Sequence, residues 1–355
     1  MEGPVENRRT QERPKINIKV SGEHNAAFSI SPNDMLLKAA LEQNIDYPHS
    51  CRVGVCGQCK TKLLAGKVSP MVDLALSPLT NQEILDGYFL ACQGKVRGDI
   101  EIEVRLGHHH VFPEQQISGR VSLWKRLPGD VIELRIALES PFFYEAGQYA
   151  YLAESGSFTR RCFSFSDAPP LDPKVGATEV GFLIKRLPGG RFSEWLFEKD
   201  RTGIKMWLHG PYGVMGVDEP NADGLCVAGG TGLAPVLSIV EHRLRTSATA
   251  CFTVVYGVQK QADLFGMDKL TTLASRHPGR LSILPVLSHE PENSDWTGAR
   301  GLVTQPLDEN LGVDFGSVAS FICGSLPMVA AVEQRLLALG VNPERIHADK
   351  FLPSG

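Results

Sequence analysis

The sequence lacks the features that would place it in a membrane or on a nucleic acid. No apolar run in its 355 residues approaches the roughly 20 residues that a membrane-spanning helix needs, and residues 1–14 are too polar for a secretory signal. Basic charge is not in excess either, because 36 Lys and Arg stand against 40 Asp and Glu. We therefore expect no membrane span of its own and no nucleic-acid partner.

Part of the cysteine content has the spacing of an iron–sulfur site. Three cysteines form the pattern C-x4-C-x2-C, and a fourth follows further on, so the predicted ligands are Cys51, Cys56, Cys59 and Cys92. This spacing is typical of a plant-type [2Fe–2S] cluster, which needs four thiolates. Gly54 and Gly57 permit positive φ and let backbone N–H groups turn toward the sulfurs. A zinc site would favour paired C-x2-C arms, and ordinary buried cysteines would not gather in a glycine-rich loop.

The other cysteines are scattered along the chain, at Cys162, Cys226, Cys251 and Cys323. Such a distribution indicates a reducing compartment rather than a disulfide framework, so we expect a cytoplasmic protein. Cys226 and Cys251 are interpreted as core cysteines. Cys323 is a better candidate for a functional site, because it ends a predicted strand beside a glycine.

The first third of the chain has the pattern of a small sheet with one helix. Residues 1–14 offer almost nothing to bury and are predicted to form a tail. Ser31 to Asp34 predict the start of a helix that runs to about Gln43. Alternating apolar residues predict strands at 16–20, 27–30, 61–64 and 100–104, with a turn at 23–25. Together they outline a β-grasp domain over residues 15–106.

Residues 107–116 are predicted to be a linker. Three consecutive histidines, His108 to His110, could bind a metal ion, but no carboxylate or cysteine stands near them at ligand spacing. We interpret them as part of a solvated connector.

Residues 117–219 are predicted to form an antiparallel β-barrel. Closely spaced strand signals cover residues 118–125, 131–138, 148–153, 162–166 and 180–185. Two stretches within it could bind an anion. One contains Arg161, and the other is the turn at Gly189 and Gly190, which leads into a helix through about Glu198 and presents free N–H groups. Each stretch alone is weak evidence for phosphate binding.

Residues 220–355 are predicted to form a doubly wound α/β domain. Strands at 224–228, 251–256, 281–286 and 321–323 alternate with helices at 233–245, 263–275 and 328–339. The turn Gly229–Gly232 follows the first strand, at the edge where such sheets bind ligands. It is neither G-x-G-x-x-G nor a P-loop, because the Gly-Lys-Ser/Thr ending is missing, so nucleotide hydrolysis is not expected. Cys323 and Gly324 end a later strand at the same edge.

Taken together and in this order, the motifs of residues 15–355 resemble the ferredoxin–NADP(H) reductase superfamily with a plant-type ferredoxin at the N-terminus. Among fused members, the chain is most similar to electron-transfer components of bacterial oxygenases of the xylene monooxygenase type. The resemblance assigns flavin contacts to Arg161, Cys162, Phe163, Ser164, Gly189, Gly190, Arg191, Phe192 and Ser193. It assigns nicotinamide nucleotide contacts to Gly229, Gly230, Thr231, Gly232, Cys323, Gly324 and Met328, and an acid-x-aromatic ending to Asp349 and Phe351.

The same resemblance implies that Ser164, Cys323 and Asp349 are the residues at the reacting rings. Two departures stand out. Phe163 replaces the family's tyrosine, so the phenol O–H is missing although the ring remains. Asp349 stands where glutamate is common, and its reach is shorter.

The implied function is to pass electrons from NADH through FAD and the [2Fe–2S] cluster to a terminal oxygenase, either soluble or membrane-bound. NADH is favoured over NADPH because the loop 257–265 contains only one cation, Lys260, together with Asp263, which would repel a 2′-phosphate. Two alternatives stay open: the same chemistry could serve a deoxysugar dehydratase, or the protein could sense redox state without turnover.

Overall fold

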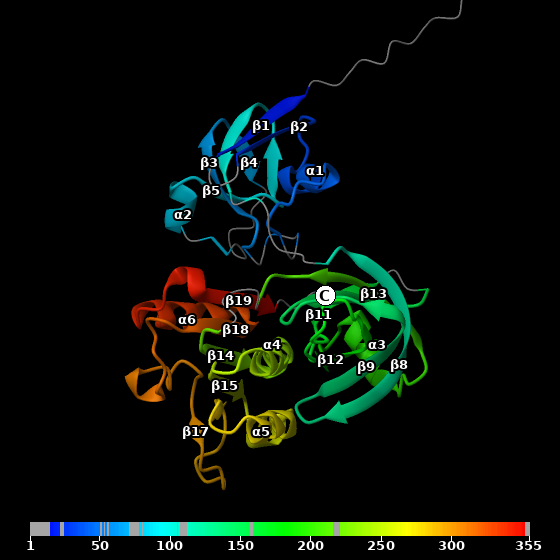
Figure 1. The fold of residues 1–355 in the computed structure, drawn as a ribbon, viewed down its shortest axis with the longest axis vertical. Coiled ribbons are helices and arrows are strands. Elements are labelled where there is room, and N and C mark those ends of the chain that lie inside the picture. Colours follow the sequence, from blue (N-terminus) through cyan, green and yellow to red (C-terminus); the bar gives the residue numbers. More distant parts are fainter. Residues whose placement is uncertain are drawn as a thin grey trace, which may run out of the picture. The chain divides into compact units, whose positions relative to one another are not determined.

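The computed structural model describes residues 15–21, 25–49, 52, 54, 57–70, 78–79, 81–104, 106, 112–156, 159–215 and 221–351. The predicted tail, the predicted turn at 23–24, Cys51, Cys56 and the three histidines of the linker lie outside these residues. The chain separates into two compact units, residues 1–109 and 110–355 (Figure 1).

The first unit is built on a mixed sheet whose strand order is β2-β1-β7-β3-β5. β1 pairs in parallel with β7, and the other pairings are antiparallel. The strands of this sheet are β1 (Ile16–Ser21), β2 (Ala26–Ile30), β3 (Lys60–Ala65), β5 (Tyr88–Leu90) and β7 (Ile100–Glu103). Its other elements are α1 (Leu36–Glu42), α2 (Asn81–Leu85), and the paired strands β4 (Val68–Pro70) and β6 (Gly94–Val96).

The alternation of buried and exposed residues along its strands explains how this sheet buries one of its two faces. In β1, Ile16, Ile18 and Val20 are buried while the residues between them are exposed, as the period of two along a strand requires. Leu36, Leu37, Ala39 and Ala40 of α1 join the same core. The helix begins at Leu36, two residues after the predicted start at Ser31 to Asp34, where the backbone forms a turn instead.

The second unit begins with an antiparallel sheet in the order β11-β10-β13-β8-β9-β12. Its strands are β8 (Gln115–Leu127), β9 (Val131–Phe142), β10 (Tyr149–Glu154), β11 (Arg160–Ser164), β12 (Ala177–Lys185) and β13 (Lys205–Tyr212), and α3 (Arg191–Glu198) follows β12. β13 is missing from the predicted strands, although it lies between β10 and β8. An isolated antiparallel bridge between Phe165 and Phe182 joins the end of β11 to β12.

The last part of the chain forms a parallel sheet in the order β17-β16-β15-β14-β18-β19. The strands are β14 (Gly224–Gly229), β15 (Phe252–Val258), β16 (Leu281–Leu287), β17 (Ala299–Arg300), β18 (Ala319–Ser325) and β19 (Ile346–Phe351). The helices are α4 (Leu233–Thr246), α5 (Met267–Arg276) and α6 (Leu326–Ala338), with 3-10 turns at Gly230–Gly232, Gln261–Asp263, Glu309–Leu311 and Pro343–Arg345.

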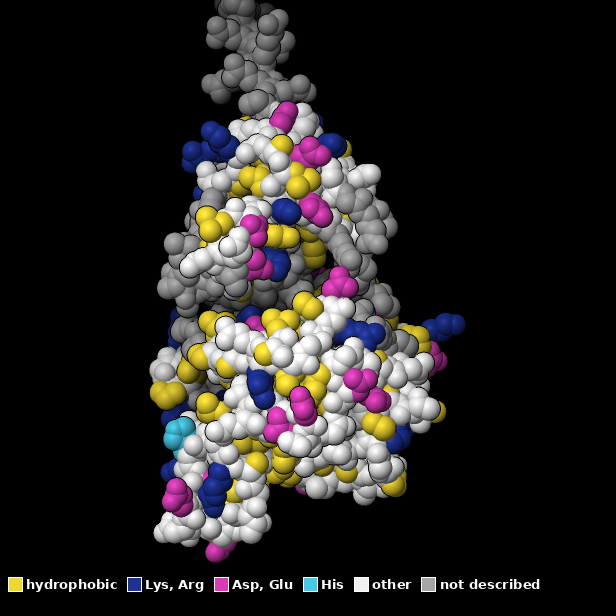
Figure 2. All heavy atoms as spheres, turned by 90° about the vertical axis from the view of Figure 1, so that its left-hand side faces the viewer, with side chains coloured by type: hydrophobic (Ala, Val, Ile, Leu, Met, Phe, Trp, Pro, Cys, Tyr) yellow, Lys and Arg dark blue, Asp and Glu magenta, His cyan; other side chains and the backbone are white. Residues whose placement is uncertain are grey.

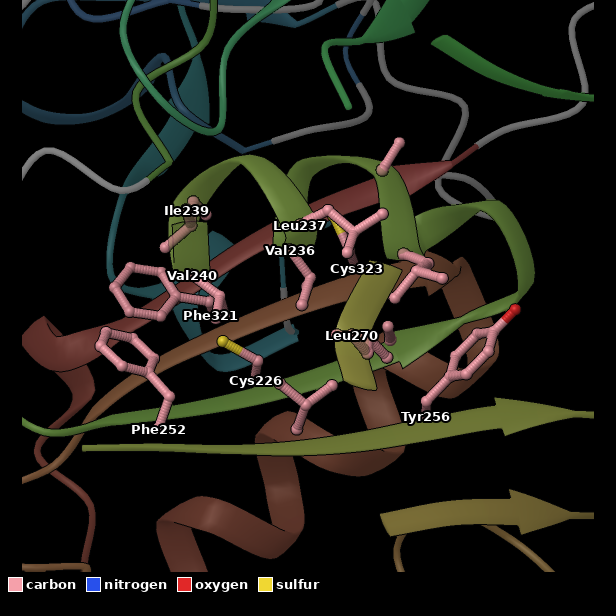
Figure 3. Packing of buried hydrophobic residues seen from close by; sticks show 14 of the residues in the cluster. Cys226, Val236, Leu237, Ile239, Val240, Phe252, Tyr256, Leu270, Phe321 and Cys323 are labelled. Atoms are coloured by element: carbon pink, nitrogen blue, oxygen red, sulfur yellow. The ribbon is translucent and has the colours of Figure 1, made fainter. Parts of the chain in front are cut away.

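Helices cover both faces of this parallel sheet. On one face, α4 packs its apolar side onto β14, β15 and β18, and Figure 3 shows Val236 and Val240 above Cys226 and Phe321. On the other face, α6 packs against the opposite side chains of the same strands. Each fully buried Val, Leu, Ile or Phe contributes roughly 1.5–3 kcal/mol, so the packing of helices on both faces stabilises this sheet.

Two predictions in this part are wrong. Cys251, interpreted as a core cysteine, is exposed because it lies just before β15 begins. The helix predicted from residue 263 begins at Met267, because residues 261–263 form a 3-10 turn and Gly266 has a left-handed φ of 71°. Cys226 is a core cysteine, as predicted.

Figure 2 shows small groups of hydrophobic side chains among acidic and basic ones, so charge of one sign does not gather on this face. None of the helices in the described ranges combines the length and apolar character needed to span a bilayer.

Candidate functional site

Two of the four predicted cluster ligands lie side by side in the first unit. Cys59 precedes β3 and Cys92 follows β5, and the backbone N–H of Cys92 donates to the Cys59 Sγ at 3.5 Å. Both side chains are buried, at 3% and 6% exposed. The Gln93 Nε2 donates to the Cys92 Sγ at 3.8 Å. The strands therefore bring Cys59 and Cys92, 33 positions apart, into contact, with N–H donors directed at both sulfurs, as suits an iron–sulfur site.

The glycines of the cysteine loop adopt the backbone conformation that the sequence predicted. Gly54 has φ 88° and Gly57 has φ 79°. A Cβ on Gly54 would lie 2.9 Å from the Cγ of Gln93, next to the ligand Cys92. Glycine is required there because both the dihedral angle and the space exclude a side chain.

Hydrogen bonds that sequence analysis did not predict also hold the cysteine loop. Arg52 donates to the Nε2 of His49 at 3.0 Å. Arginine has only donors, so Nε2 must be the acceptor, and the proton on Nδ1 is donated to the carbonyl O of Tyr47 at 2.7 Å. The hydroxyl of Tyr47 contacts the Thr61 Oγ1 at 2.6 Å. Burial raises the pKa of Tyr47, which keeps this phenol neutral.

In the second unit, β11 carries the predicted flavin residues on its two faces. Arg161 and Phe163 share one face of the strand, whereas Cys162 and Ser164 share the other. The Phe163 ring lies 5.3 Å from the ring of Phe192 in α3. This contact brings together two predicted flavin stretches. Cys162 is exposed.

The turn before α3 is held by its own serine. Ser193 Oγ accepts from the Leu187 N–H at 3.0 Å and lies 3.2 Å from the Gly190 carbonyl O. Gly189 has φ 76°, and Gly190 is the N-cap residue without a capping side chain. The first N–H groups of α3 are therefore not covered by a side-chain cap, which suits a phosphate.

The glycine turn after β14 packs directly onto the strand that carries Cys323. A Cβ on Gly232 would lie 2.2 Å from the carbonyl O of Cys323, and one on Gly229 would lie 2.4 Å from the Sδ of Met328. Side chains at these two positions are excluded, whereas a Cβ on Gly230 would meet nothing within 4 Å, so the turn is open at that residue. This arrangement fits a pyrophosphate held by backbone N–H groups.

Three predicted residues meet where the two sheets of this unit join. Ser164 at the end of β11 donates to the Oδ2 of Asp349 in β19 at 3.3 Å. Asp349 is the register partner of Cys323 on the neighbouring strand β18. Burial raises the pKa of the Cys323 thiol well above its ordinary value, and the nearby charge of Asp349 adds to this. Cys323 is therefore a neutral, fully buried thiol at this junction.

A network that sequence analysis did not identify holds the junction in place. The carbonyl O of Asp167 accepts from Ser238 Oγ in α4 at 2.7 Å and from the Tyr144 hydroxyl at 3.0 Å. The Asp167 carboxylate pairs with Arg135 at 3.0 Å, and Arg135 also pairs with Glu179 at 2.6 Å. These residues link β11 to the helix that begins at the glycine turn. No short motif contains them, because they come from five separate stretches.

The residues of these three sites therefore suit three different cofactors. Buried, adjacent thiols fit an iron–sulfur cluster; the arginine strand and the uncapped α3 fit a flavin phosphate; the glycine-rich turn beside Cys323 fits a dinucleotide. Within the described residues no group of three His, Cys, Asp or Glu gathers as a further metal site.

These features define a redox protein in which an iron–sulfur domain serves an NAD-binding oxidoreductase domain. Residues 18–97 match the family described as 2Fe-2S iron-sulfur cluster binding domain, and residues 226–334 match the oxidoreductase NAD-binding domain.

Similar proteins extend over nearly the whole chain. The xylene/toluene monooxygenase electron transfer component of Pseudomonas putida is 35% identical over 95% of this chain and 94% of its own. A CDP-6-deoxy-L-threo-D-glycero-4-hexulose-3-dehydrase reductase of Yersinia pestis is 28% identical over 92% of this chain and 96% of its own. The Amycolatopsis cytochrome P450 reductase has a TM-score of 0.74 at 28% identity and covers 95% of this chain and 99% of its own.

The chain therefore belongs to the family of ferredoxin–NAD(P) reductases with an N-terminal [2Fe–2S] domain that act as electron-transfer components. The family resemblance stated from the motifs is confirmed, and with it the set of cofactors: a [2Fe–2S] cluster, a flavin of the FAD type and a nicotinamide nucleotide.

Proposed function

We propose that this protein is the NADH-dependent reductase component of a multicomponent oxygenase, and that it reduces a terminal hydroxylase, soluble or membrane-bound. The observation that carries the proposal is the meeting of Ser164, Cys323 and Asp349 at one junction. These residues would hold a flavin, which would supply the exchange between the two-electron chemistry of NADH and the one-electron chemistry of a [2Fe–2S] cluster. Similarity to the xylene/toluene monooxygenase component supports the choice of acceptor.

Each residue at the junction has a proposed task. Ser164 holds a hydrogen bond to Asp349 at 3.3 Å and offers its hydroxyl to the flavin edge. Cys323, neutral and buried, packs against the nicotinamide and excludes water from the reacting carbon. Asp349 orients Ser164 from the last strand, and Phe351, two residues on, covers the flavin ring. The chain thus aligns the two rings, which is the protein's contribution to the rate.

The remaining predicted residues hold phosphates and sulfurs. Arg161 and the α3 turn bind the flavin pyrophosphate, and Phe163 with Phe192 supports its ring. The glycine turn, including Thr231, binds the nicotinamide nucleotide, and Gly324 and Met328 line the same site. The cluster ligands are Cys51, Cys56, Cys59 and Cys92.

We further propose four parts: residues 15–106 for the cluster, a linker at 107–116, an FAD-binding barrel at 117–219 and a doubly wound NAD domain at 220–355. The bridge between Phe165 and Phe182 supports barrel closure, because it joins the two edge strands. The cysteines of the described residues form no disulfide, which supports a cytoplasmic location.

A second acceptor is favoured by one observation. The deoxysugar reductase of Yersinia pestis covers the chain almost as fully as the oxygenase component does, so a deoxysugar dehydratase is the alternative partner. Neither comparison favours a redox sensor.

The test is to add NADH anaerobically to the purified protein and to follow flavin and cluster absorbance, then cytochrome c reduction. Rapid bleaching of both chromophores and sustained turnover are expected. A single partial reduction without turnover would indicate a sensor. Parallel reconstitution with an oxygenase and with a deoxysugar dehydratase decides the acceptor, because only the true acceptor should be reduced efficiently.

Cys323→Ala is expected to slow flavin reduction by NADH about tenfold, because a small misplacement of the nicotinamide is costly. Stopped-flow absorbance measures this rate. Cys226→Ala is the matched control, since both thiols are fully buried and only Cys323 lies at the junction. Equal rates in the two variants would make Cys323 an ordinary core residue.

A further inference from the structure

The corner of the parallel sheet beyond the glycine turn is formed by two loops that run side by side. The N–H of Ser288 donates to the carbonyl O of Val258 at 3.1 Å, and the N–H of His289 donates to that of Gln259 at 2.8 Å. The loops after β15 and β16 are thus tied together at the carboxyl edge. Figure 3 shows that these strands run in the same direction as β14. In open α/β sheets the ribose of a dinucleotide binds one strand away from the glycine turn.

Two carboxylates occupy the backbone donors of this corner. Asp263 Oδ2 accepts from the Lys260 N–H at 3.0 Å, and Glu290 Oε2 accepts from the Gln261 N–H at 2.7 Å. Consecutive N–H groups of this kind would otherwise be available to phosphate oxygens. The hydrogen bonds from Gln261 and Ser294 hold the pKa of Glu290 below its ordinary value, so this carboxylate is charged at neutral pH.

Arg300, which donates to the carbonyl O of Glu290, is committed elsewhere. Arg300 NH1 donates to the carbonyl O of Glu290 at 3.2 Å and of Pro291 at 2.9 Å. Its NH2 donates to Ser294 Oγ at 3.1 Å and to the Trp296 carbonyl O at 2.8 Å. Both NH1 and NH2 of the Arg300 guanidinium are therefore hydrogen-bonded within the loop after β16. This pair of nitrogens is not available to bind a phosphate.

We propose that Glu290 is a specificity-determining residue that excludes NADPH, by occupying the N–H of Gln261 and placing a second negative charge beside Asp263 where a 2′-phosphate would bind. The inference rests on the proposed NADH-dependent function. Glu290 lies in the loop after β16, whereas Asp263 lies in the loop after β15. The negative charge at this place therefore comes from two loops. A carboxylate at this place accepts a hydrogen bond from a ribose hydroxyl but repels a phosphate.

Glu290→Gln tests this assignment, because the amide keeps an oxygen for the Gln261 N–H and removes only the charge. The ratio of kcat/KM for NADPH to that for NADH, measured by ferricyanide reduction, is expected to rise about tenfold. Binding of 2′,5′-ADP, measured by calorimetry, should tighten by a similar factor while binding of AMP stays unchanged. Added salt should narrow the difference between wild type and variant.

Glu292→Gln is the matched control, since Glu292 is exposed two residues further on and its loss removes the same charge from the same loop. An unchanged ratio in Glu290→Gln, an equal change in Glu292→Gln, or a parallel loss of 2′,5′-ADP and AMP binding would each overturn the assignment. If neither NADH nor NADPH reduces the wild-type protein, the proposed function fails, and the binding of 2′,5′-ADP still decides the role of Glu290.

Discussion

Cys59→Ser is expected to abolish cytochrome c reduction while NADH-dependent ferricyanide reduction continues. Cys59 is buried against Cys92, and the serine hydroxyl is a poor replacement for one of the four thiolates that the cluster needs. The residues proposed to bind the flavin and the nicotinamide nucleotide belong to the separate compact unit, residues 110–355. Loss of the cluster should therefore leave the first electron transfer intact. Visible absorbance, electron paramagnetic resonance and the two acceptor assays measure the effect.

Cys251→Ser is the control for this variant, because Cys251 is exposed and lies in the other unit. It should retain both activities and the cluster spectrum. If Cys59→Ser still reduces cytochrome c at the normal rate, electrons leave the flavin without passing through the cluster. If it loses ferricyanide reduction as well, the two units are not functionally separable.

Arg161→Ala is expected to purify partly free of flavin, with the [2Fe–2S] spectrum retained. A charge-assisted hydrogen bond contributes about 1.5–3 kcal/mol, so FAD should bind about 10- to 100-fold more weakly. Added FAD should restore much of the activity, because Ser164 and Cys323 are unchanged. Flavin content after gel filtration and titration with FAD measure the affinity.

Arg160→Ala is the internal control, because Arg160 is the neighbouring cation and the motif register does not assign it to the flavin. The Arg160 guanidinium lies 5.6 Å from the ring of Tyr151, and its position in β11 places it on the face opposite to Arg161. This variant should keep its flavin. Equal losses in both variants, or a loss in Arg160→Ala alone, would mean that the strand register assigned to the flavin is off by one residue.

Local signals predicted most of the elements, and the failures have physical reasons. β13 was missed because Lys205–Tyr212 contains a histidine, a glycine and a proline, and only its place between β10 and β8 makes it a strand. β19 was missed because all of its residues are only half-buried, so no apolar alternation marks it. The helix predicted from residue 263 starts late because of the conformation of Gly266.

The residues of the candidate site also differ in whether the sequence alone could identify them. The cysteine spacing is a short pattern whose chemistry follows from residue type and distance along the chain. The stretches at Arg161 and at Gly189 and Gly190 were weak alone, and only the family resemblance assigned them to a flavin and the glycine turn to a nicotinamide nucleotide. The His49–Arg52 pair and the Asp167–Arg135–Glu179 network have no such pattern. The network depends on which strands become neighbours, whereas His49 and Arg52 lie only three positions apart in one local stretch.

The sequence by itself indicated the cofactors, because the cysteine spacing predicts a [2Fe–2S] cluster and the remaining motifs, taken in order, resemble a family that binds FAD and a nicotinamide nucleotide. The tertiary structure alone decided that Ser164 meets Asp349, 185 residues away, and that Asp349 lies in register with Cys323. It also decided that Glu290 takes the Gln261 N–H. These contacts join residues from different strands and loops, and strand pairing over long sequence separations is set by the packing of the whole core.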